Sequence, residues 1–269
     1  MNFAIIGEST RESLSPKMHQ WIYRSLGFEH SYEFIDITVN HVDNIVNKLR
    51  KQNLNGVNIT IPFKSTFIDY LDDLDELAVH IGSINCIHSY NGILKGYNTD
   101  YYGFKSLISN NNIDLKNRKI LVLGAGGASR SICTYLAHNN LKFSIFNRTY
   151  KNALSVIDKI GYAHNGEVIE DSISNIQYNI IINCLPLSVN ISDYLQSIGY
   201  NYNLLDYYID INYHINENIQ DNIKAKFFIN GLDMLIYQGI QSNEIWLQKD
   251  LEEKVDYTNL RNYLLGEQC

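Results

Sequence analysis

The chain is organised around Lys119-Ile-Leu-Val-Leu-Gly-Ala-Gly-Gly-Ala-Ser-Arg-Ser131. The apolar run at 120–123 predicts a buried strand of a parallel sheet. A glycine-rich turn follows at once, and residues 129–139 carry apolar side chains at helical spacing. A strand, a glycine turn and a helix in this order are typical of a dinucleotide-binding unit.

The glycines of this stretch suit a phosphate group. Gly124 permits the tight turn, Gly126 lets the backbone approach a pyrophosphate, and the free N–H groups at the helix start face the phosphate oxygens. Ser129 stands at the third position of the usual G-x-G-x-x-G/A pattern, so the match is imperfect and a plain strand–helix connection is the alternative. Because the motif begins only near residue 120, a substantial element must precede it.

Length and composition limit the class of protein. The 269 residues allow one large or two medium domains, and the net charge of −7 argues against a nucleic-acid partner. The eight histidines show no metal-ligand spacing, so we expect no metal site. No apolar run is long enough to span a membrane, and the first residues do not resemble a signal peptide.

The cysteines indicate a reducing compartment. They are widely scattered and contain no C-x-x-C pair: Cys86, Cys133, Cys184 and Cys269. Reduced thiols are therefore favoured over disulfides, and we expect a cytoplasmic protein.

The first hundred residues predict a separate α/β domain. Strands are expected at 2–7, 31–37 and 56–61, with helices between them at 16–26 and 39–51. This alternation indicates a parallel sheet. The next segments are expected to be one helix at 65–81, with its acidic residues in solvent, and a hairpin of 83–90 and 93–97 around Asn91-Gly92.

Polar residues follow the ends of these strands. Ser13 and Ser15 come after the first strand, where open α/β sheets bind ligands, although helix capping and turn formation are the alternative. Asn58 and Thr60 alternate along the third strand and therefore point to one face, which a buried strand would normally fill with Val or Ile.

Lys64 and Asp100 are the candidate reactive groups. Lys64 follows the third strand just past Pro62, and Asn85 lies in the first arm of the hairpin. The second arm ends at Tyr97-Asn-Thr-Asp100, before a helix expected at 101–109. A surface lysine and a helix N-cap are the alternative interpretations.

The strand expected at 142–146 bears on the choice of cofactor. An NAD-binding unit usually places an acidic residue after this strand to hold the ribose 2′-hydroxyl. Here Asn147, Arg148 and Thr149 follow instead. A guanidinium matches the geometry of a 2′-phosphate, so we favour NADP over NAD, with a surface arginine as the alternative.

The remainder of the chain continues the α/β pattern. Strands are expected at 178–184, 203–211 and 226–229, and helices at 232–246 and 256–265. Gln238 is a polar residue within the first of these helices.

With these motifs placed, the chain resembles shikimate dehydrogenase along almost its whole length. The shared segments are Ser13-Leu-Ser-Pro-Lys-Met-His19, Asn58-Ile-Thr-Ile-Pro-Phe-Lys64, Gly82-Ser-Ile-Asn85, Tyr97-Asn-Thr-Asp100, Gly124-Ala-Gly-Gly-Ala-Ser129, Asn147-Arg-Thr149 and Asn230-Gly-Leu-Asp-Met-Leu-Ile-Tyr-Gln-Gly239. Each is short, but seven in the family's order make coincidence implausible.

The resemblance implies a two-domain α/β fold with an active-site cleft. Residues 1–101, completed by C-terminal helices at 236–269, are expected to bind the substrate, and residues 102–235 are expected to be a Rossmann-like NADP-binding domain. Lys64 and Asp100 resemble the catalytic pair. The implied substrate contacts are Ser13, Ser15, Asn58, Thr60, Asn85 and Gln238. The implied cofactor contacts are Gly124, Ala125, Gly126, Gly127, Ala128, Asn147, Arg148, Thr149 and Gly231.

Two segments depart from the family pattern. The family often has Asn-Thr-Thr-Pro-x-Gly-Met where this chain has Asn183-Cys-Leu-Pro-Leu-Ser-Val189, which bears on the binding of NADP. The family also has an Asp-x-x-Tyr-x-Pro segment. The tyrosine is absent from Asp206-Tyr-Tyr-Ile209, whereas Asp210-Ile-Asn-Tyr213 restores it without the proline, so Tyr213 is a candidate substrate contact.

The function that the resemblance implies is reversible, NADPH-dependent reduction of 3-dehydroshikimate to shikimate, in the chorismate pathway to aromatic amino acids. One rival is a quinate or other polyol-acid dehydrogenase, with NAD as a possible cofactor. Another is a non-catalytic binding or regulatory relative. We expect a small-molecule substrate, no membrane partner and a monomer or homodimer.

Overall fold

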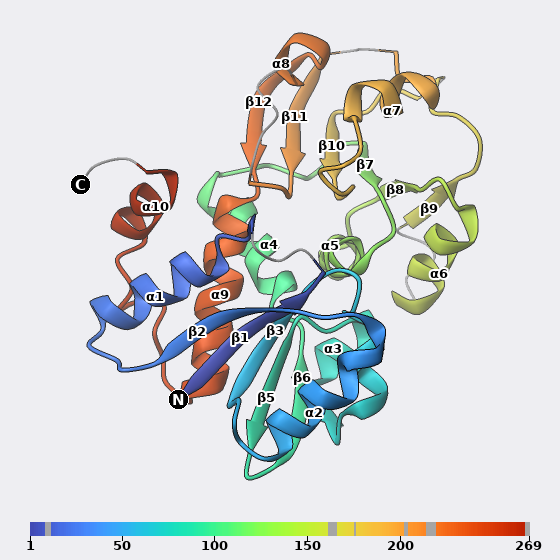
Figure 1. The fold of residues 1–269 in the computed structure, drawn as a ribbon. Coiled ribbons are helices and arrows are strands. Elements are labelled where there is room, and N and C mark those ends of the chain that lie inside the picture. Colours follow the sequence, from blue (N-terminus) through green and yellow to red (C-terminus); the bar gives the residue numbers. More distant parts are fainter. Residues whose placement is uncertain (9–11, 161–165, 175, 202–203, 214–218, 267–269) are drawn as a thin grey trace. The chain divides into compact units, whose positions relative to one another are not determined.

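The computed structural model describes residues 1–8, 12–160, 166–174, 176–201, 204–213 and 219–266 (Figure 1). The chain folds into two compact units, one of Met1–Gly103 with Leu235–Cys269 and the other of Phe104–Met234. Each unit contains a sheet of six strands with helices. The expected α/β fold class is confirmed. Cys269 lies outside the described residues.

The sheet of the first unit is mixed. Its strands are β1 (Asn2–Gly7), β2 (Ser31–Asp36), β3 (Gly56–Ile59), β4 (Asp73–Leu74), β5 (Cys86–Tyr90) and β6 (Ile93–Tyr97), in the order β2-β1-β3-β5-β6-β4. The strand β1 pairs in parallel with β2 and β3, as expected, but β5 runs antiparallel to β3 and β6. Asn91 and Gly92, with φ of 52° and 80°, form the tight turn of the predicted hairpin.

The helical segments around this sheet are α1 (Ser15–Ser25), η2 (Val39–His41), α2 (Val42–Arg50), η3 (Thr66–Tyr70), α3 (Glu76–Ile81) and α10 (Tyr257–Leu265). The helices α4 (Asp100–Asn110) and α9 (Leu232–Leu247) each begin in one unit and end in the other. Pro16 stands in the first turn of α1, where its missing N–H costs no hydrogen bond.

The single helix expected at 65–81 is wrong. The chain forms η3, the short strand β4 and α3 instead, because its middle part pairs with the sheet. Asp72 N donates to Leu94 O at 2.9 Å, and Leu94 N donates to Asp72 Oδ2 at 2.8 Å. The carboxylates are structural as well, since Asp72 pairs with Arg50 and Asp75 caps α3.

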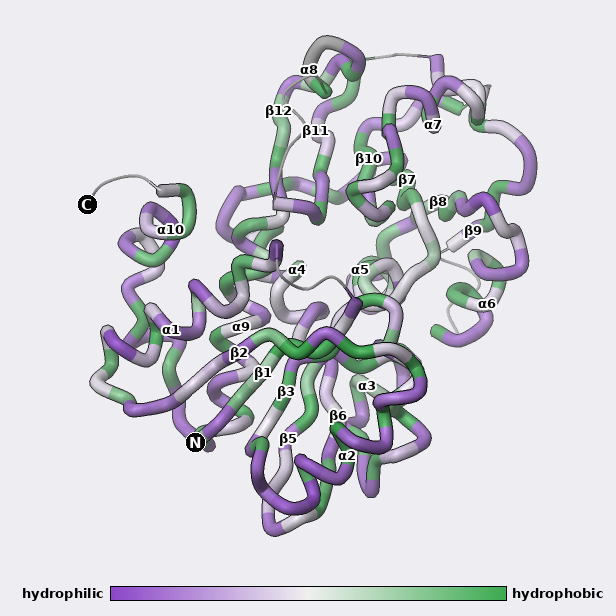
Figure 2. The backbone as a smooth tube through the Cα atoms, viewed as in Figure 1, coloured by the Kyte–Doolittle hydropathy of each residue, from purple (hydrophilic) through white to green (hydrophobic). Residues whose placement is uncertain are grey.

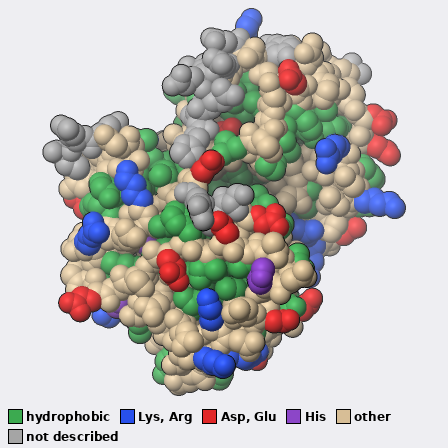
Figure 3. Space-filling view, in the orientation of Figure 1, with side chains coloured by type: hydrophobic (Ala, Val, Ile, Leu, Met, Phe, Trp, Pro, Cys, Tyr) green, Lys and Arg blue, Asp and Glu red, His purple; other side chains and the backbone are tan. Residues whose placement is uncertain are grey.

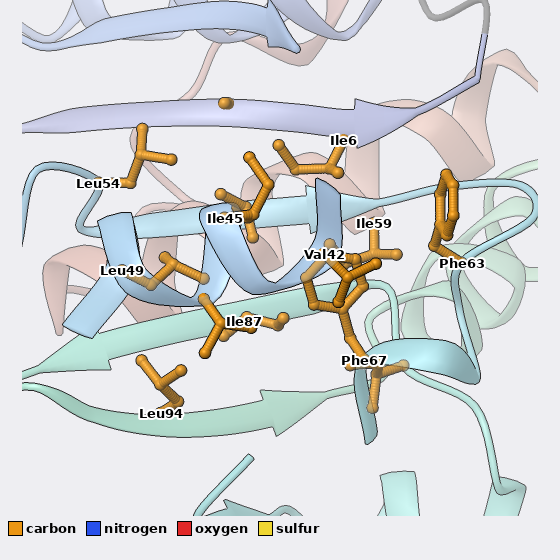
Figure 4. Close-up of a cluster of buried hydrophobic side chains, with 14 of the residues drawn as sticks. Ile6, Val42, Ile45, Leu49, Leu54, Ile59, Phe63, Phe67, Ile87 and Leu94 are labelled. Carbon is orange, nitrogen blue, oxygen red and sulfur yellow. The ribbon is translucent and has the colours of Figure 1, made fainter. Parts of the chain in front are cut away.

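A cluster of buried hydrophobic side chains fills the space between α2 and the first sheet (Figure 4). Val42, Ile45, Val46 and Leu49 form the buried face of α2. They pack with Ile6, Ile59, Ile87 and other apolar residues of the strands. Full burial of one such side chain stabilises the fold by about 1.5–3 kcal/mol, so this cluster holds β3 firmly in place.

The second unit has a six-stranded parallel sheet. Its strands are β7 (Ile120–Leu123), β8 (Phe143–Phe146), β9 (Gly166–Ile169), β10 (Ile180–Asn183), β11 (Leu205–Asp210) and β12 (Ala225–Asn230), in the order β12-β11-β10-β7-β8-β9. The order reverses between β7 and β10, as in dinucleotide-binding folds. The central strands β7 and β10 are fully buried and, apart from Asn183, hydrophobic, and Figure 2 colours hydrophobic residues green.

The helices of the second unit are α5 (Gly127–His138), α6 (Tyr150–Ile160), α7 (Ile191–Ser197) and α8 (Ile219–Asn222). The helix α5 follows β7 directly and begins two residues before the expected position, at Gly127 rather than residue 129. Across the described part of the chain, no helix is long and apolar enough to cross a membrane.

Candidate active site

Lys64 and Asp100 form an ion pair in the first unit. Lys64 lies in the segment after β3, and Asp100 is the first residue of α4, three residues after the end of β6. Lys64 Nζ donates to Asp100 Oδ2, and their side chains are only 15% and 9% exposed. The other carboxylate oxygen, Oδ1, accepts a hydrogen bond from Asn85 Nδ2 at 2.9 Å. Asp100 is therefore held from two sides, with its charge largely removed from water.

Asn85 connects the strands that carry this pair. Its backbone carbonyl accepts from Ile59 N at 2.9 Å, which joins it to β3, and its side-chain Oδ1 accepts from Thr99 N at 2.6 Å. Tyr101 N donates to Asn98 Oδ1 at 3.2 Å. Asn98 thus takes the capping hydrogen bond that the sequence allowed for Asp100, and both Asp100 oxygens serve the ion pair and Asn85.

Asn58 and Gln238 belong to the same polar cluster. Asn58 Nδ2 donates to Asn85 O at 3.2 Å, and its Oδ1 accepts from the Tyr32 hydroxyl at 2.8 Å. Gln238, on α9, has its Oε1 3.2 Å from Asn85 Nδ2. A Cβ atom on Gly239 would lie 2.0 Å from Met18 Cε, so α9 and the side chain of Met18 on α1 pack closely beside Gln238.

The two serines lie at the start of α1. Ser15 is its first residue and is buried, while Ser13 is partly exposed. Ser13 Oγ donates to Ser15 Oγ at 3.1 Å and accepts from Ser15 N at 3.2 Å. The Ser15 hydroxyl also interacts with Tyr32, which reaches Asn58. The two serines therefore bond to each other in the turn before α1, and Ser15 also connects to the polar cluster through Tyr32.

The last of the predicted substrate contacts are placed differently. Thr60 lies one residue beyond β3, is partly exposed, and donates its backbone N–H to Ile6 O at 2.9 Å. Tyr213 belongs to the second unit, three residues after the end of β11, and is partly exposed.

His19 and Tyr32 are buried aromatic residues next to this cluster. Their rings stack 4.0 Å apart at an interplanar angle of 8°. Burial lowers the pKa of His19 to about 3 and raises the pKa of Tyr32 well above its ordinary value. A neutral imidazole accepts from Asn243 Nδ2 through Nδ1 at 2.9 Å, and a neutral phenol donates to Asn58. Both donor–acceptor roles are therefore constant over the physiological pH range.

In the second unit, the glycine turn has the geometry of a phosphate site. Gly124 has φ +98°, a conformation that favours glycine, and donates its N–H to Phe146 O at 2.8 Å. A Cβ on Gly126 would meet nothing within 4 Å, so open space lies over the N-terminus of α5. The Ser129 hydroxyl is buried and has no hydrogen-bond partner. Ala125, Gly127 and Ala128 are partly exposed around the same turn.

The remaining predicted cofactor contacts follow β8 and β12. Arg148 and Thr149 are exposed after β8, and Asn147 Nδ2 donates to Thr149 O at 2.9 Å, which fixes the turn. Gly231 follows β12, where a Cβ would lie 1.8 Å from Ile211 O. Gly231 is therefore required by the close approach of two backbones.

A buried carboxylate lies at the carboxyl edge of this sheet. Asp210 ends β11, and burial raises its pKa although Asn183 and Asn212 donate hydrogen bonds to it. The two bonds from their side-chain amides measure 2.9 and 2.8 Å. Asp206, near the start of β11, instead pairs with Arg118 and Lys226. Asp210, and not Asp206, therefore lies at the same carboxyl edge of the sheet as the glycine turn. Tyr213 follows Asp210 by three residues.

The sequence did not identify Tyr32, Ser242 or Asn243 as members of the polar cluster. It placed Thr99 at a turn but gave no orientation for its side chain. Gln238 and Ser242 are four residues apart in α9 and therefore share a helix face, which is the available signal. The face of the molecule in Figure 3 shows acidic and basic side chains interspersed. Among the described residues, no group of three or more His, Cys, Asp or Glu could hold a metal ion.

Two family models match parts of this chain. Residues 5–87 match the family model "Shikimate dehydrogenase substrate binding domain", and residues 106–188 match "Shikimate / quinate 5-dehydrogenase". The shikimate dehydrogenase (NADP(+)) of Staphylococcus aureus is 36% identical over 99% of this chain and 100% of its own length. The enzyme of the same name from Clostridium beijerinckii is 32% identical over 94% of both chains.

Solved structures show the same fold. Shikimate dehydrogenase from Aquifex aeolicus is 30% identical, with a TM-score of 0.82 over 98% of this chain and 97% of its own. Shikimate 5-dehydrogenase from Thermus thermophilus, in complex with NADP(H) and shikimate, is 27% identical, with a TM-score of 0.81 over 99% of each chain.

Proposed function

The chain belongs to the shikimate dehydrogenase family, and on that premise we propose that it interconverts 3-dehydroshikimate and shikimate with NADP(H). The enzyme is an NADP-dependent oxidoreductase that acts on a CH–OH group. The observation that carries the proposal is the shielded Lys64–Asp100 pair, surrounded by amide and hydroxyl groups of the same unit. Such a set suits a polar, hydroxylated acid whose one carbonyl must gain or lose a proton.

Lys64 is the proposed proton donor in the reduction of the ketone. As hydride reaches the carbonyl carbon, negative charge develops on the oxygen, and Lys64 Nζ supplies the proton there. In the oxidation of shikimate the proton returns to Nζ. Asp100 holds the ammonium group through Oδ2 and cannot rotate freely, since Asn85 holds Oδ1. General acid–base catalysis of this kind contributes about 10²- to 10⁴-fold in rate.

The proposed substrate contacts surround this pair. Ser13 and Ser15 offer hydroxyl groups to the carboxylate of shikimate, and both belong to the start of α1. Asn58, Thr60, Asn85 and Gln238 offer amide and hydroxyl groups to the ring hydroxyls. A site built from hydrogen-bonding groups binds an analogue that lacks one hydroxyl less well, so selectivity for the full polyol acid is expected.

The second unit is the proposed cofactor-binding domain. NADPH supplies the hydride when it is bound. The open space over Gly126, the unpartnered Ser129 hydroxyl and the N-terminus of α5 suit the pyrophosphate. Exposed Arg148, with Asn147 and Thr149, suits the 2′-phosphate. Gly124, Ala125, Gly127, Ala128 and Gly231 complete the proposed set.

Tyr213 is a further proposed substrate contact. Its support is that Asp210, three residues earlier, ends β11 at the carboxyl edge of the sheet, where α/β folds bind ligands. The segment after Asn183 is held to the same aspartate. Asn183 Oδ1 in turn accepts from Leu185 N at 3.1 Å, and Leu185 Cδ2 would lie 3.3 Å from a Cβ on Gly124.

A spectrophotometric assay tests the proposed function. Shikimate with NADP should yield reduced nicotinamide absorbance, and both quinate and NAD should be poorer substrates. Faster turnover with quinate or NAD would favour the rival polyol-acid dehydrogenase. Binding of shikimate and NADP without reduction would favour the non-catalytic relative.

We also propose a cytoplasmic monomer or homodimer. Support for the compartment comes from Cys86, Cys133 and Cys184, which form no disulfide bond. Sedimentation velocity would distinguish the monomer from the dimer.

A further inference from the structure

Ser242 lies at the centre of a buried hydrogen-bond network in the first unit. Its side chain is fully buried on α9, one turn after Gln238. Asn58 Nδ2 lies 2.9 Å from Ser242 Oγ, and Thr99 Oγ1 lies 3.2 Å from it. The Ser242 hydroxyl also donates to Gln238 O at 2.8 Å. One hydroxyl group therefore joins β3, the residue before α4, and α9.

The donor and acceptor roles in this network follow from a count of hydrogens. Ser242 has one hydroxyl hydrogen, which goes to Gln238 O, so its oxygen accepts from both Asn58 and Thr99. Thr99 then donates its own hydroxyl hydrogen to Ser242. Its oxygen is left to accept from Asn85 Nδ2, which lies 2.9 Å away.

The same count fixes Asp100. Asn85 Oδ1 already accepts from Thr99 N, and Asn85 Nδ2 faces the Thr99 hydroxyl, so the amide has only one orientation. In that orientation Nδ2 also donates to Asp100 Oδ1. A flipped amide would set its oxygen against the carboxylate. The rotamer of Asp100, whose Oδ2 accepts from Lys64, thus depends on the Asn85 amide. The backbone N–H and the hydroxyl of Thr99 hold that amide, and Ser242 orients the hydroxyl.

We propose, resting on the function proposed above, that Ser242 and Thr99 are positioning residues that orient the Asp100 carboxylate through Asn85. Without the Ser242 hydroxyl, the Thr99 hydroxyl turns to Gln238 Oε1, which is 3.4 Å away. The Thr99 hydroxyl then competes for Gln238 Oε1 with Asn85 Nδ2, which approaches the same oxygen at 3.2 Å. This competition loosens the Asn85 amide that bonds to Asp100, although Thr99 N still holds Asn85 Oδ1.

Steady-state kinetics of Ser242→Ala, Thr99→Val and Thr99→Ser test the proposal. Ser89→Ala is the matched control, because Ser89 is a buried serine of the same unit whose hydroxyl donates to a backbone carbonyl, Leu49 O, at 2.6 Å. We expect Ser242→Ala and Thr99→Val each to lower kcat about tenfold with an unchanged KM for NADP. Thr99→Ser, which keeps the hydroxyl, should restore kcat, and Ser89→Ala should keep it.

Normal kcat in Ser242→Ala and Thr99→Val would overturn the proposal, as would an equal loss in Ser89→Ala, which would indicate general destabilisation. If Ser242→Ala does not fold, the pair Thr99→Val and Thr99→Ser decides alone. Lys64→Ala in the same series separates the two proposals. An inactive Lys64→Ala beside a fully active Ser242→Ala and Thr99→Val overturns only the positioning role, whereas an active Lys64→Ala overturns the catalytic pair and the positioning role with it.

Discussion

Burial of neutral His19 should make the stability of the first unit decrease in mild acid, because the unfolded chain takes up a proton at this residue. His19 is completely buried, and its pKa falls from 6.5 to about 3 because burial disfavours the imidazolium. The unfolded chain therefore binds the proton first. The stability contributed by neutral His19 is complete above pH 6.5 and is lost as the pH falls toward 3.

The size of the effect follows from the two pKa values. At about 1.4 kcal/mol per pH unit, the difference between 6.5 and about 3 amounts to about 5 kcal/mol at the acid limit. By pH 5 about 2 kcal/mol is already lost, which is a large share of a typical stability of about 5–15 kcal/mol. In the folded protein His19 stays neutral at pH 5, so its stacking on Tyr32 and the bond from Tyr32 to Asn58 are unchanged there.

Urea unfolding of the wild type and of His19→Asn, between pH 7 and 5, measures this effect. The asparagine keeps an acceptor near Nδ1 for Asn243 but does not titrate. We expect the variant to be less stable at pH 7, with a free energy of unfolding that falls by about 2 kcal/mol less over this range. The opposite shift from Asp210, whose pKa is raised, is common to both proteins and cancels in the difference. Equal slopes for the two proteins would refute the assignment of a depressed pKa to His19.

Three further predictions concern the second unit. Arg148→Ala should raise the KM for NADP about tenfold or more, while the KM for NAD stays unchanged, since only NADP carries the 2′-phosphate; equal effects on both cofactors would contradict this role. Gly126→Ala should fold normally but bind NADP weakly, because its Cβ enters space that is open in the protein. Gly231→Ala should be less stable than the wild type, because its Cβ would lie 1.8 Å from Ile211 O. Calorimetry with and without NADP separates the two variants. A destabilised Gly126→Ala beside a stable Gly231→Ala that binds NADP weakly would contradict both predictions.

The features that local sequence predicts well are those set by local chemistry. The glycine turn, the helix start at Ser15-Pro16 and the turn at Asn91-Gly92 all lie at the expected positions. Each depends on backbone conformations that particular residues favour within a few positions.

The features that it misses depend on tertiary partners. The segment after Ser65 has helical spacing, yet Asp72 bonds to Leu94 and the chain becomes an edge strand. Hydrogen bonding to the edge of a sheet outweighs a weak helical preference. The local sequence does not show that such an edge is available for pairing. In the same way, Asn58, Thr99 and Ser242 are far apart in sequence, and only the packing of α9 brings their polar atoms together.

The role of Lys64 is tested most directly by the turnover of Lys64→Ala with shikimate and NADP. Lys95→Ala is the matched control, because Lys95 is also ion-paired with an aspartate in the same unit, but its side chain is 39% exposed. Lys64→Ala should lower kcat by about 10²- to 10⁴-fold, with a KM for shikimate within a few-fold of the wild type. Lys95→Ala should be fully active. Near-normal turnover in Lys64→Ala would contradict the catalytic role of Lys64, whatever its effect on substrate affinity.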